Sequence, residues 1–239
     1  MKQNNTIYYL QHKDILNKDI LINEIYANKT TNYYYSDDFS EEFYIDLCSL
    51  GFISTSIINN NELFLLPEIQ FEYAILDFKD LHISKKVKKL LKKEDYIFEV
   101  DKNLEKVLDK LDKYHKPNWL IKEYKELIIK LNKRKNHNNF EIKTFCIIDK
   151  NTKEIIAGEI GYKIGKTYTS LTGFSSKEKK YNNYGKLQLV VTGEYLKKER
   201  YKIWNLGHPY MEYKIKLGAK IYTREQFIKR WIEAIKTEK

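Results

Sequence analysis

Apolar and polar residues alternate along the first of three strand-like runs in the second half of the chain. The runs are short and rich in β-branched and aromatic side chains: Phe140–Ile148, Glu154–Ile164 and Thr167–Phe174. Alternation with a period of two is typical of β-strands that bury one face. Turn-forming residues, among them the Gly165-Lys166 pair, lie between the runs, so we expect consecutive antiparallel hairpins.

A helical pattern follows the third strand. Residues Gly185–Lys198 have helical spacing, Lys202–Leu206 is a further strand, and Met211–Leu217 is a short helix ended by Gly218. This order of elements resembles the core of the GNAT acyltransferases. In that core the strand after the helix separates from its neighbour, the gap holds the reacting acyl group, and the start of the helix favours an anion. We therefore predict an α+β fold with a GNAT-like domain, whose mixed, mostly antiparallel sheet is flanked by helices.

The first part of the chain predicts a smaller unit. A helix with Ser40 near its start ends at Gly51. Three strand-like runs follow it: Phe52–Ile58, Glu62–Leu66 and Phe71–Phe78. We expect an N-terminal α/β domain of residues 1–80 and the GNAT-like domain over residues 81–239.

A strongly basic amphipathic helix is predicted after Ser84, which can cap its start. Val87, Leu90 and Leu91 form its apolar side. Its other side carries six lysines: Lys85, Lys86, Lys88, Lys89, Lys92 and Lys93. Two further helices are expected, Leu104–Lys113 and Asn118–Leu131.

The composition favours an anionic partner. Lys and Arg number 43 against 33 Asp and Glu, a formal net charge of +10. Such an excess suits RNA, a nucleotide cofactor or an anionic membrane, although a general bias toward lysine explains it equally well. Cys48 and Cys146 have no disulfide or zinc-ligand spacing. The N-terminal residues lack the apolar run of a signal peptide and no stretch approaches 18 apolar residues, so we expect a cytoplasmic protein.

Three polar residues are candidates for catalysis. Glu159 lies inside a predicted strand, where an unpaired buried charge is costly, so it is a candidate general base or a partner for an ammonium group. The alternative is a solvent-facing acid. His208 follows a strand end and can shuttle a proton near neutral pH, and Asn205 can hydrogen-bond a carbonyl or an amine. A structural role is the alternative for His208.

Other residues are candidates for holding the substrate. Hydroxyl side chains recur along the strand that contains Gly173, whose missing side chain allows a ligand to approach closely. Trp119 and Tyr124 lie near a helix start and can wall an apolar pocket, or pack in the core. The expected substrate-binding residues are Trp119, Tyr124, Tyr162, Thr169, Thr172, Gly173 and Gln188. No metal-ligand cluster, Walker loop, G-x-G-x-x-G or Ser-His-Asp signature occurs.

Several segments together resemble the leucyl/phenylalanyl-tRNA–protein transferase family, from about Asp38 to Trp231. They include Asn118-Trp119-Leu120-Ile121, Gly173-Phe174-Ser175 and Leu217-Gly218-Ala219. Members of that family move Leu or Phe from its tRNA to the N-terminal basic residue of a protein.

The resemblance implies a role for each of these groups. Trp119 and Tyr124 would belong to the pocket for the aminoacyl end, and the six lysines would meet RNA phosphates. The expected partners are an aminoacyl-tRNA and a protein or peptide with a free N-terminus, with no membrane. The expected enzyme is a monomeric aminoacyltransferase that needs no metal and no cofactor besides the charged tRNA.

The chain departs from the family at two places that matter for the reaction. Leu171 stands where the family has an acidic residue, and Leu206-Gly207-His208 stands where the family has Asp-Cys-Gln. We predict that catalysis rests instead on Glu159, Asn205 and His208. Two other functions stay open. One is an acyl-CoA-dependent N-acyltransferase, although the loop 177–186 has only one glycine for a pyrophosphate. The other is a non-catalytic relative that binds tRNA.

Overall fold

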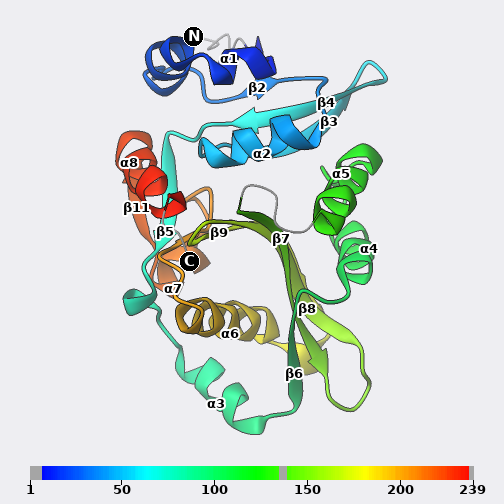
Figure 1. Cartoon of the computed structure of the whole chain (residues 1–239). Helices are drawn as coiled ribbons and strands as arrows, with labels where there is room; N and C mark the ends of the chain where they lie inside the picture. Colours follow the sequence, from blue (N-terminus) through cyan, green and yellow to red (C-terminus); the bar gives the residue numbers. More distant parts are fainter. Residues whose placement is uncertain (1–6, 135–138, 237–239) are drawn as a thin grey trace, which may run out of the picture.

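The centre of the molecule is a curved seven-stranded sheet (Figure 1). The computed structural model describes residues 7–134 and 139–236. From one edge to the other, the strands are β11 (Lys220–Thr223), β5 (Glu72–Leu76), β10 (Ile203–Asn205), β9 (Thr167–Ser175), β8 (Ile155–Ile164), β7 (Phe140–Asp149) and β6 (Tyr96–Val100). Neighbouring strands of this sheet are antiparallel, except β9 and β10, which are parallel.

Helices cover both faces of the sheet. α6 (Tyr184–Lys198) lies along one face and packs against α3 (Lys85–Lys93), whereas α4 (Leu104–Tyr114) and α5 (Lys122–Lys133) lie on the other (Figure 1). The remaining helices are α1 (His12–Leu16), α2 (Glu41–Ser49), α7 (Glu212–Leu217) and α8 (Arg224–Ile235), with a π-helix over Ile20–Tyr26 and short 3₁₀ turns at Phe78–Asp80 and Lys179–Tyr181. Two small sheets complete the fold: β1 (Tyr8–Tyr9) with β2 (Tyr34–Tyr35), and the hairpin of β3 (Ile53–Asn59) and β4 (Glu62–Glu68).

Alternation along the strands divides the core into two. On β7, Phe145 and Ile147 belong to the core beneath α6, whereas Cys146 and Ile148 belong to the core on the opposite face. Trp204 of β10 lies in the α6 core and is fully buried. Burial of one large apolar side chain stabilises the fold by about 1.5–3 kcal/mol. A strand turned over would lose this contribution at several positions, so the order of its side chains decides which face meets which helices.

A buried arginine connects the C-terminal part of the chain with the N-terminal segments. Arg224 is 6% exposed, and its guanidinium donates hydrogen bonds to backbone carbonyl oxygens at several segment ends. The accepting residues are Ile25, Tyr26, Asn28, Thr31, Ile69 and Gln70. A buried cation is tolerated when its donors are satisfied, so these carbonyls hold the N-terminal segments against the start of α8.

The predicted fold class is confirmed: the sheet is mixed, mostly antiparallel and flanked by helices. The three strands and the helix of the expected GNAT-like core are β7, β8, β9 and α6. The edge strands β6 and β11 were not predicted. The division at residue 80 stays a prediction, and β5, which comes from the first 80 residues, lies inside the large sheet between β10 and β11.

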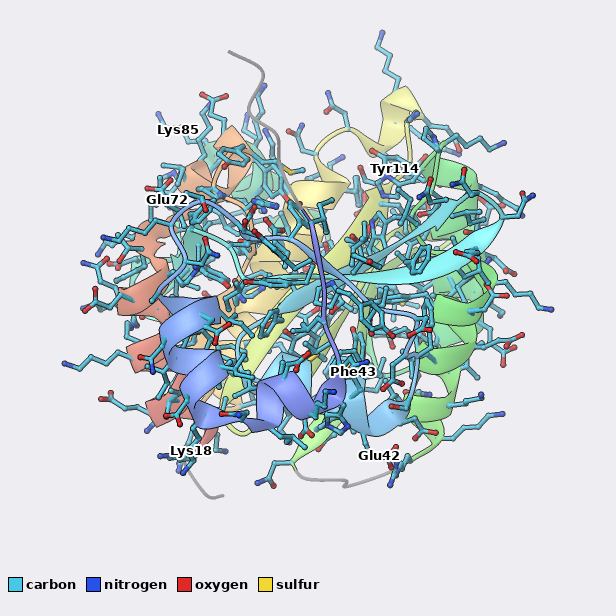
Figure 2. All side chains as sticks on the ribbon, turned by 90° about the horizontal axis from the view of Figure 1, so that it is seen from above. Lys18, Glu42, Phe43, Glu72, Lys85 and Tyr114 are labelled. Atoms are coloured by element: carbon cyan, nitrogen blue, oxygen red, sulfur yellow. The ribbon has the colours of Figure 1, made fainter. Side chains whose placement is uncertain are left out.

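Charged side chains project outward around the outline of the molecule, among them Lys18, Glu42 and Lys85 (Figure 2). Within residues 7–134 and 139–236, no helix combines the length and the apolar character needed to span a bilayer.

Candidate active site

A cavity opens where β9 and β10 stop pairing. The two strands pair only where Thr167–Thr169 of β9 lie beside Ile203–Asn205 of β10. Beyond these residues lies a cavity of about 650 Å³, lined by Ser170 to Ser175 of β9, by α6 and by residues that follow β10. Trp119 from the α4–α5 side and Gln188 from α6 both line it. The cavity therefore lies at the gap between the two parallel strands.

A β-bulge shapes the β9 wall of this cavity. Ile160 pairs with Thr172 and Gly161 pairs with Ser170, so Leu171 has no partner across the ladder. A bulge re-aims the side chains beside it. Leu171 lines the cavity as part of an apolar wall, at the position where the resemblance implied an acid.

Glu159 places a buried carboxyl group in the lining of the cavity. It is 3% exposed, and its Oε1 accepts hydrogen bonds from the Tyr168 hydroxyl at 2.9 Å and the Ser170 hydroxyl at 3.3 Å. The Trp204 indole N–H donates to Ser170 Oγ at 2.9 Å and fixes that hydroxyl. A Cβ at Gly161 would lie 2.5 Å from the Tyr168 hydroxyl oxygen, so a glycine is needed where Tyr168 reaches Glu159.

Burial raises the pKa of Glu159 to about 7, while hydrogen bonds from Tyr168, Ser170 and Gln188 act in the opposite direction. Loss of hydration disfavours the charged carboxylate. A carboxyl group with a pKa near neutrality exchanges a proton readily at physiological pH, which is the property of a general base. Tyr168 was not among the predicted site residues, because a tyrosine in a strand is ordinary.

Gly173 keeps the carboxyl group accessible. It lies directly across from Glu159 in the β8–β9 ladder and lines the cavity. A Cβ at this position would lie 3.2 Å from the Glu159 Cβ and 3.1 Å from the Gly158 carbonyl oxygen. His115 Nε2 lies 2.9 Å from the Gly173 carbonyl oxygen and 3.3 Å from Thr172 Oγ1, so α4 holds the end of β9. His115 also lines the cavity, although the sequence did not mark it as a site residue.

Lys214 supplies a buried cation to the same cavity. It is 6% exposed, and its ammonium donates to the carbonyl oxygen of Leu206 and, at 2.7 Å, to that of His208. Burial lowers the pKa of Lys214 to about 8. An ammonium group has three donors, and these two bonds leave one for a ligand. No sequence signal marks this lysine, since it is one of many and lies on a short helix.

Of the two predicted aromatic residues, Trp119 lines the cavity and Tyr124 lies behind it. Tyr124 is fully buried, and its hydroxyl group donates to the Ser54 carbonyl oxygen at 2.8 Å and lies 2.8 Å from the Tyr44 hydroxyl. The Tyr124 ring meets the Trp119 ring edge-on, with centroids 5.1 Å apart. Tyr124 therefore supports the indole of Trp119 and does not itself line the cavity.

Several predicted residues lie outside the cavity lining. Tyr162 is fully buried and donates to the Phe52 carbonyl oxygen at 3.2 Å, and Thr169 is fully buried as well. Asn205 Oδ1 accepts the Gly207 N–H at 2.9 Å, which holds the turn after β10. His208 Nε2 lies 2.8 Å from Glu68 Oε2, on the side of the β3–β4 hairpin.

Five of the predicted residues line this cavity together: Trp119, Glu159, Thr172, Gly173 and Gln188. Gln188 also donates to Thr192 Oγ1 at 3.0 Å. Catalytic roles for Asn205 and His208 stay predictions.

The basic helix is present as α3, with Ser84 as its N-cap. The side chains of Lys85, Lys86, Lys88, Lys89, Lys92 and Lys93 are all exposed. In the part of the chain that the structure describes, none of these six forms an ion pair. Over the same part of the chain, no three His, Cys, Asp or Glu side chains are grouped as metal ligands.

Solved structures of low sequence identity are similar to much of this chain. L-PGS from Bacillus licheniformis is 13% identical with a TM-score of 0.46, over 86% of this chain and 73% of its own. FemX is 10% identical with a TM-score of 0.46, over 82% of this chain and 71% of its own. The C-terminal domain (DUF2156) of a putative lysylphosphatidylglycerol synthetase from Agrobacterium fabrum is 12% identical with a TM-score of 0.44, over 81% of this chain and 66% of its own.

Sequence comparison assigns the chain to a family. No curated protein sequence matches it. The family model described as leucyl/phenylalanyl-tRNA protein transferase matches residues 75–231, which include β6 to β11, α6 and the residues that line the cavity. The chain belongs to the leucyl/phenylalanyl-tRNA protein transferase family, and is an acyltransferase that uses aminoacyl-tRNA.

Proposed function

We propose that this chain moves an apolar amino acid, such as leucine, from its tRNA to the N-terminal amine of a protein or peptide. The observation that carries the proposal is the cavity between β9 and β10, where a buried carboxyl group and a buried ammonium group meet apolar walls. Glu159 and Lys214 are the buried ionisable residues of its lining, at 3% and 6% exposed. Its volume of about 650 Å³ falls within the range of small-molecule sites.

The walls of the cavity favour an apolar aminoacyl group. Six apolar side chains line it: Trp119, Leu171, Phe174, Leu189, Leu206 and Met211. Removal of an apolar side chain from water contributes about 25 cal/mol per Å². The same walls offer no carboxylate other than Glu159 to a charged side chain among the described residues, so a basic amino acid fits less well.

The reaction that we propose needs alignment, a proton acceptor and stabilisation of one oxygen. The acceptor amine attacks the carbonyl carbon of the aminoacyl ester, a C–N bond forms, and the C–O bond to the ribose breaks. Glu159 takes the proton that the amine loses, and this proton then passes to the ribose oxygen. The Lys214 ammonium donates a hydrogen bond to the carbonyl oxygen while its negative charge grows. In this scheme the charged tRNA is the only co-substrate.

Glu159 and Lys214 can take the place of the acid and the glutamine that the family has and this chain lacks at Leu171 and His208. Glu159 reaches the cavity from the neighbouring strand because Gly173 has no side chain between them. Lys214 reaches it from α7, anchored on the turn that holds Leu206 and His208.

The test is a comparison of donors. The chain is incubated with peptides of different N-terminal residues and, separately, with tRNAs carrying labelled leucine, phenylalanine or lysine, or with labelled acetyl-CoA. We expect labelled peptide from leucyl-tRNA or phenylalanyl-tRNA. Label from acetyl-CoA alone would establish the acyl-CoA-dependent alternative, and tRNA binding without any transfer would establish the non-catalytic one.

A further inference from the structure

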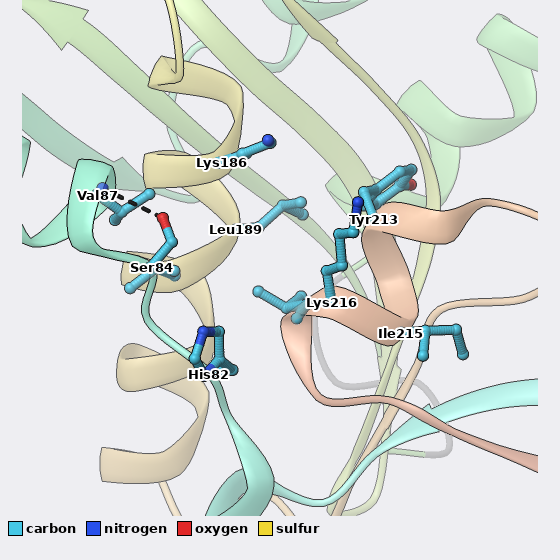
Figure 3. A pocket seen from close by; sticks show the side chains of 10 residues that line it. His82, Ser84, Val87, Lys186, Leu189, Tyr213, Ile215 and Lys216 are labelled. Carbon is cyan, nitrogen blue, oxygen red and sulfur yellow. Dashed lines mark hydrogen bonds between the residues drawn. The ribbon is translucent and has the colours of Figure 1, made fainter.

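A second pocket, of about 460 Å³, lies beside the reaction cavity between α3, α6 and α7 (Figure 3). The two spaces share Lys186, Leu189 and Tyr213 in their linings. Lys186 and Leu189 point from α6 toward α7, and Tyr213 and Lys216 lie on the α7 side (Figure 3). The two spaces are therefore adjacent, with these three side chains at their boundary.

The pocket combines an apolar interior with cations. Its apolar lining consists of Val87, Leu189, Val190, Ile215 and Leu217. Tyr213 and His82 add two aromatic rings, and Lys186 and Lys216 are the charged residues of the lining, with no acid among them. A flat apolar ring that bears a phosphate nearby matches this combination, because aromatic groups stack on bases and lysines pair with phosphates.

The charged lining differs at another side of the reaction cavity. A pocket of about 280 Å³ there shares Tyr114, Phe174 and Ser175 with the cavity, and its lining mixes three lysines with Glu154 and Glu178. The pocket between α3, α6 and α7 has lysines and no acid in its lining, so it suits a polyanion better. It also meets α3, whose six lysines are exposed.

We propose that the pocket between α3, α6 and α7 holds the base of the tRNA nucleotide that precedes the terminal adenosine. This inference rests on the proposed function, since the terminal adenosine carries the aminoacyl ester into the reaction cavity. The base stacks against Tyr213 above the apolar floor, and its phosphate lies near Lys186. The adenine of a CoA molecule has similar chemistry, and the test below separates the two sources.

The experiment measures binding of uncharged RNA, so it does not depend on transfer. Ile215 lines the pocket between α3, α6 and α7 but not the reaction cavity, and it is 43% exposed. Ile221 on β11 is 50% exposed and lines neither space. The variants are Ile215→Glu, its conservative partner Ile215→Val, and Ile221→Glu as the matched control. The probes are an acceptor-stem minihelix with a single-stranded CCA end, and the same minihelix without the penultimate base.

We expect loss of the penultimate base to weaken binding to the unaltered chain about tenfold, which is typical of one stacked base. Ile215→Glu should weaken binding of the complete minihelix by a similar factor, and removal of the base should then have little further effect. Ile215→Val and Ile221→Glu should behave like the unaltered chain. Thermal melts show that each variant is folded.

Equal binding of the complete minihelix by Ile215→Glu and Ile221→Glu would overturn the inference, as would a full tenfold loss when the base is removed in Ile215→Glu. Binding of CoA that depends on Ile215, without such dependence for RNA, would assign the pocket to CoA. RNA binding that depends on Ile215, without any transfer, would contradict the proposed function and leave this inference standing. Normal transfer, with RNA binding that depends on neither Ile215 nor the penultimate base, would contradict this inference and leave the proposed function standing.

Discussion

Two buried carboxyl groups lie near the end of β10, and their surroundings differ in a way that separates structure from chemistry. Glu68 is 3% exposed, and its two oxygens are occupied: Oε1 accepts from Asn32 at 2.6 Å, and Oε2 lies 2.8 Å from His208 Nε2 and accepts from Gln70 at 3.4 Å. Glu159 is equally buried, yet its Oε1 accepts from two hydroxyl groups and the residue lines a cavity.

The surroundings of the two carboxyl groups differ in whether a cation already neutralises the charge. A charge that is paired and fully hydrogen-bonded stabilises the position of its partners, and removal of one partner leaves the other uncompensated. A carboxyl group that lacks a cation and faces a cavity keeps the capacity to bind an ammonium or take its proton. Glu68 and His208 therefore hold the hairpin against the turn after β10, while Glu159 lines the cavity.

The largest expected effect is on Glu159. Glu159→Gln keeps the size and the hydrogen bonds of the side chain but cannot take a proton, so the transfer rate should fall about 1,000-fold. His208→Gln should change the rate by less than about tenfold, because only positioning is affected. Single-turnover transfer from charged tRNA measures both, with Glu194→Gln on the exposed side of α6 as the control. A larger loss in His208→Gln than in Glu159→Gln would reverse the comparison.

Lys214 comes next. Lys214→Met retains the apolar stem and removes the charge, and loss of one donor to a developing oxyanion costs about 100-fold in rate. The pKa of Lys214 is lowered to about 8, so the ammonium is present below pH 8 and lost above it. The rate should fall above about pH 8 in the unaltered chain but not in Lys214→Met.

The matched control for Lys214 is Lys197→Met, an exposed lysine of α6. A full rate in Lys214→Met, or the same fall above pH 8 in that variant, would remove Lys214 from the mechanism. A variant that is slow but still shows the fall would assign the pH dependence to another group.

The smallest expected effect is on RNA binding at the surface. Replacing Lys85, Lys89 and Lys92 of α3 by Gln should weaken tRNA binding several-fold, and the slope of log affinity against log salt should become shallower by about 0.9 for each phosphate that the variant no longer neutralises. The control replaces Lys106, Lys110 and Lys113 of α4, where acids of the same helix are interspersed. Equally weakened binding from the two helices would show that overall charge, and not α3, attracts the RNA.

Much of the fold could be predicted because strong local patterns coincide with buried elements. β7 alternates, β8 and β9 are rich in strand-forming Ile, Thr and Tyr, and Ser84 and the spacing of Val87 and Leu90 define α3. The edge strands β6 and β11 were missed, since β6 is only half-buried along its length and β11 is largely exposed. A strand that buries neither face completely lacks the period-two signal.

The candidate site was only partly predictable for a physical reason. Glu159 could be found because an acid inside an apolar strand is costly unless it has a use. His208 could not be placed, since its partner Glu68 is distant in sequence and draws the imidazole toward the hairpin. Lys214 gave no signal at all, because its role depends on the turn carbonyls of Leu206 and His208.

The central claim is that Glu159 accepts the proton of the attacking amine, and the pH dependence of single-turnover transfer tests it most directly. The pKa of Glu159 is raised to about 7, so the carboxyl group is protonated and inactive below pH 7 and ionised above it. We expect the rate of the unaltered chain to rise through about pH 7, and this rise to be absent from the residual rate of Glu159→Gln. The same rise in both proteins would contradict the claim, because it would then belong to the amine or to another group.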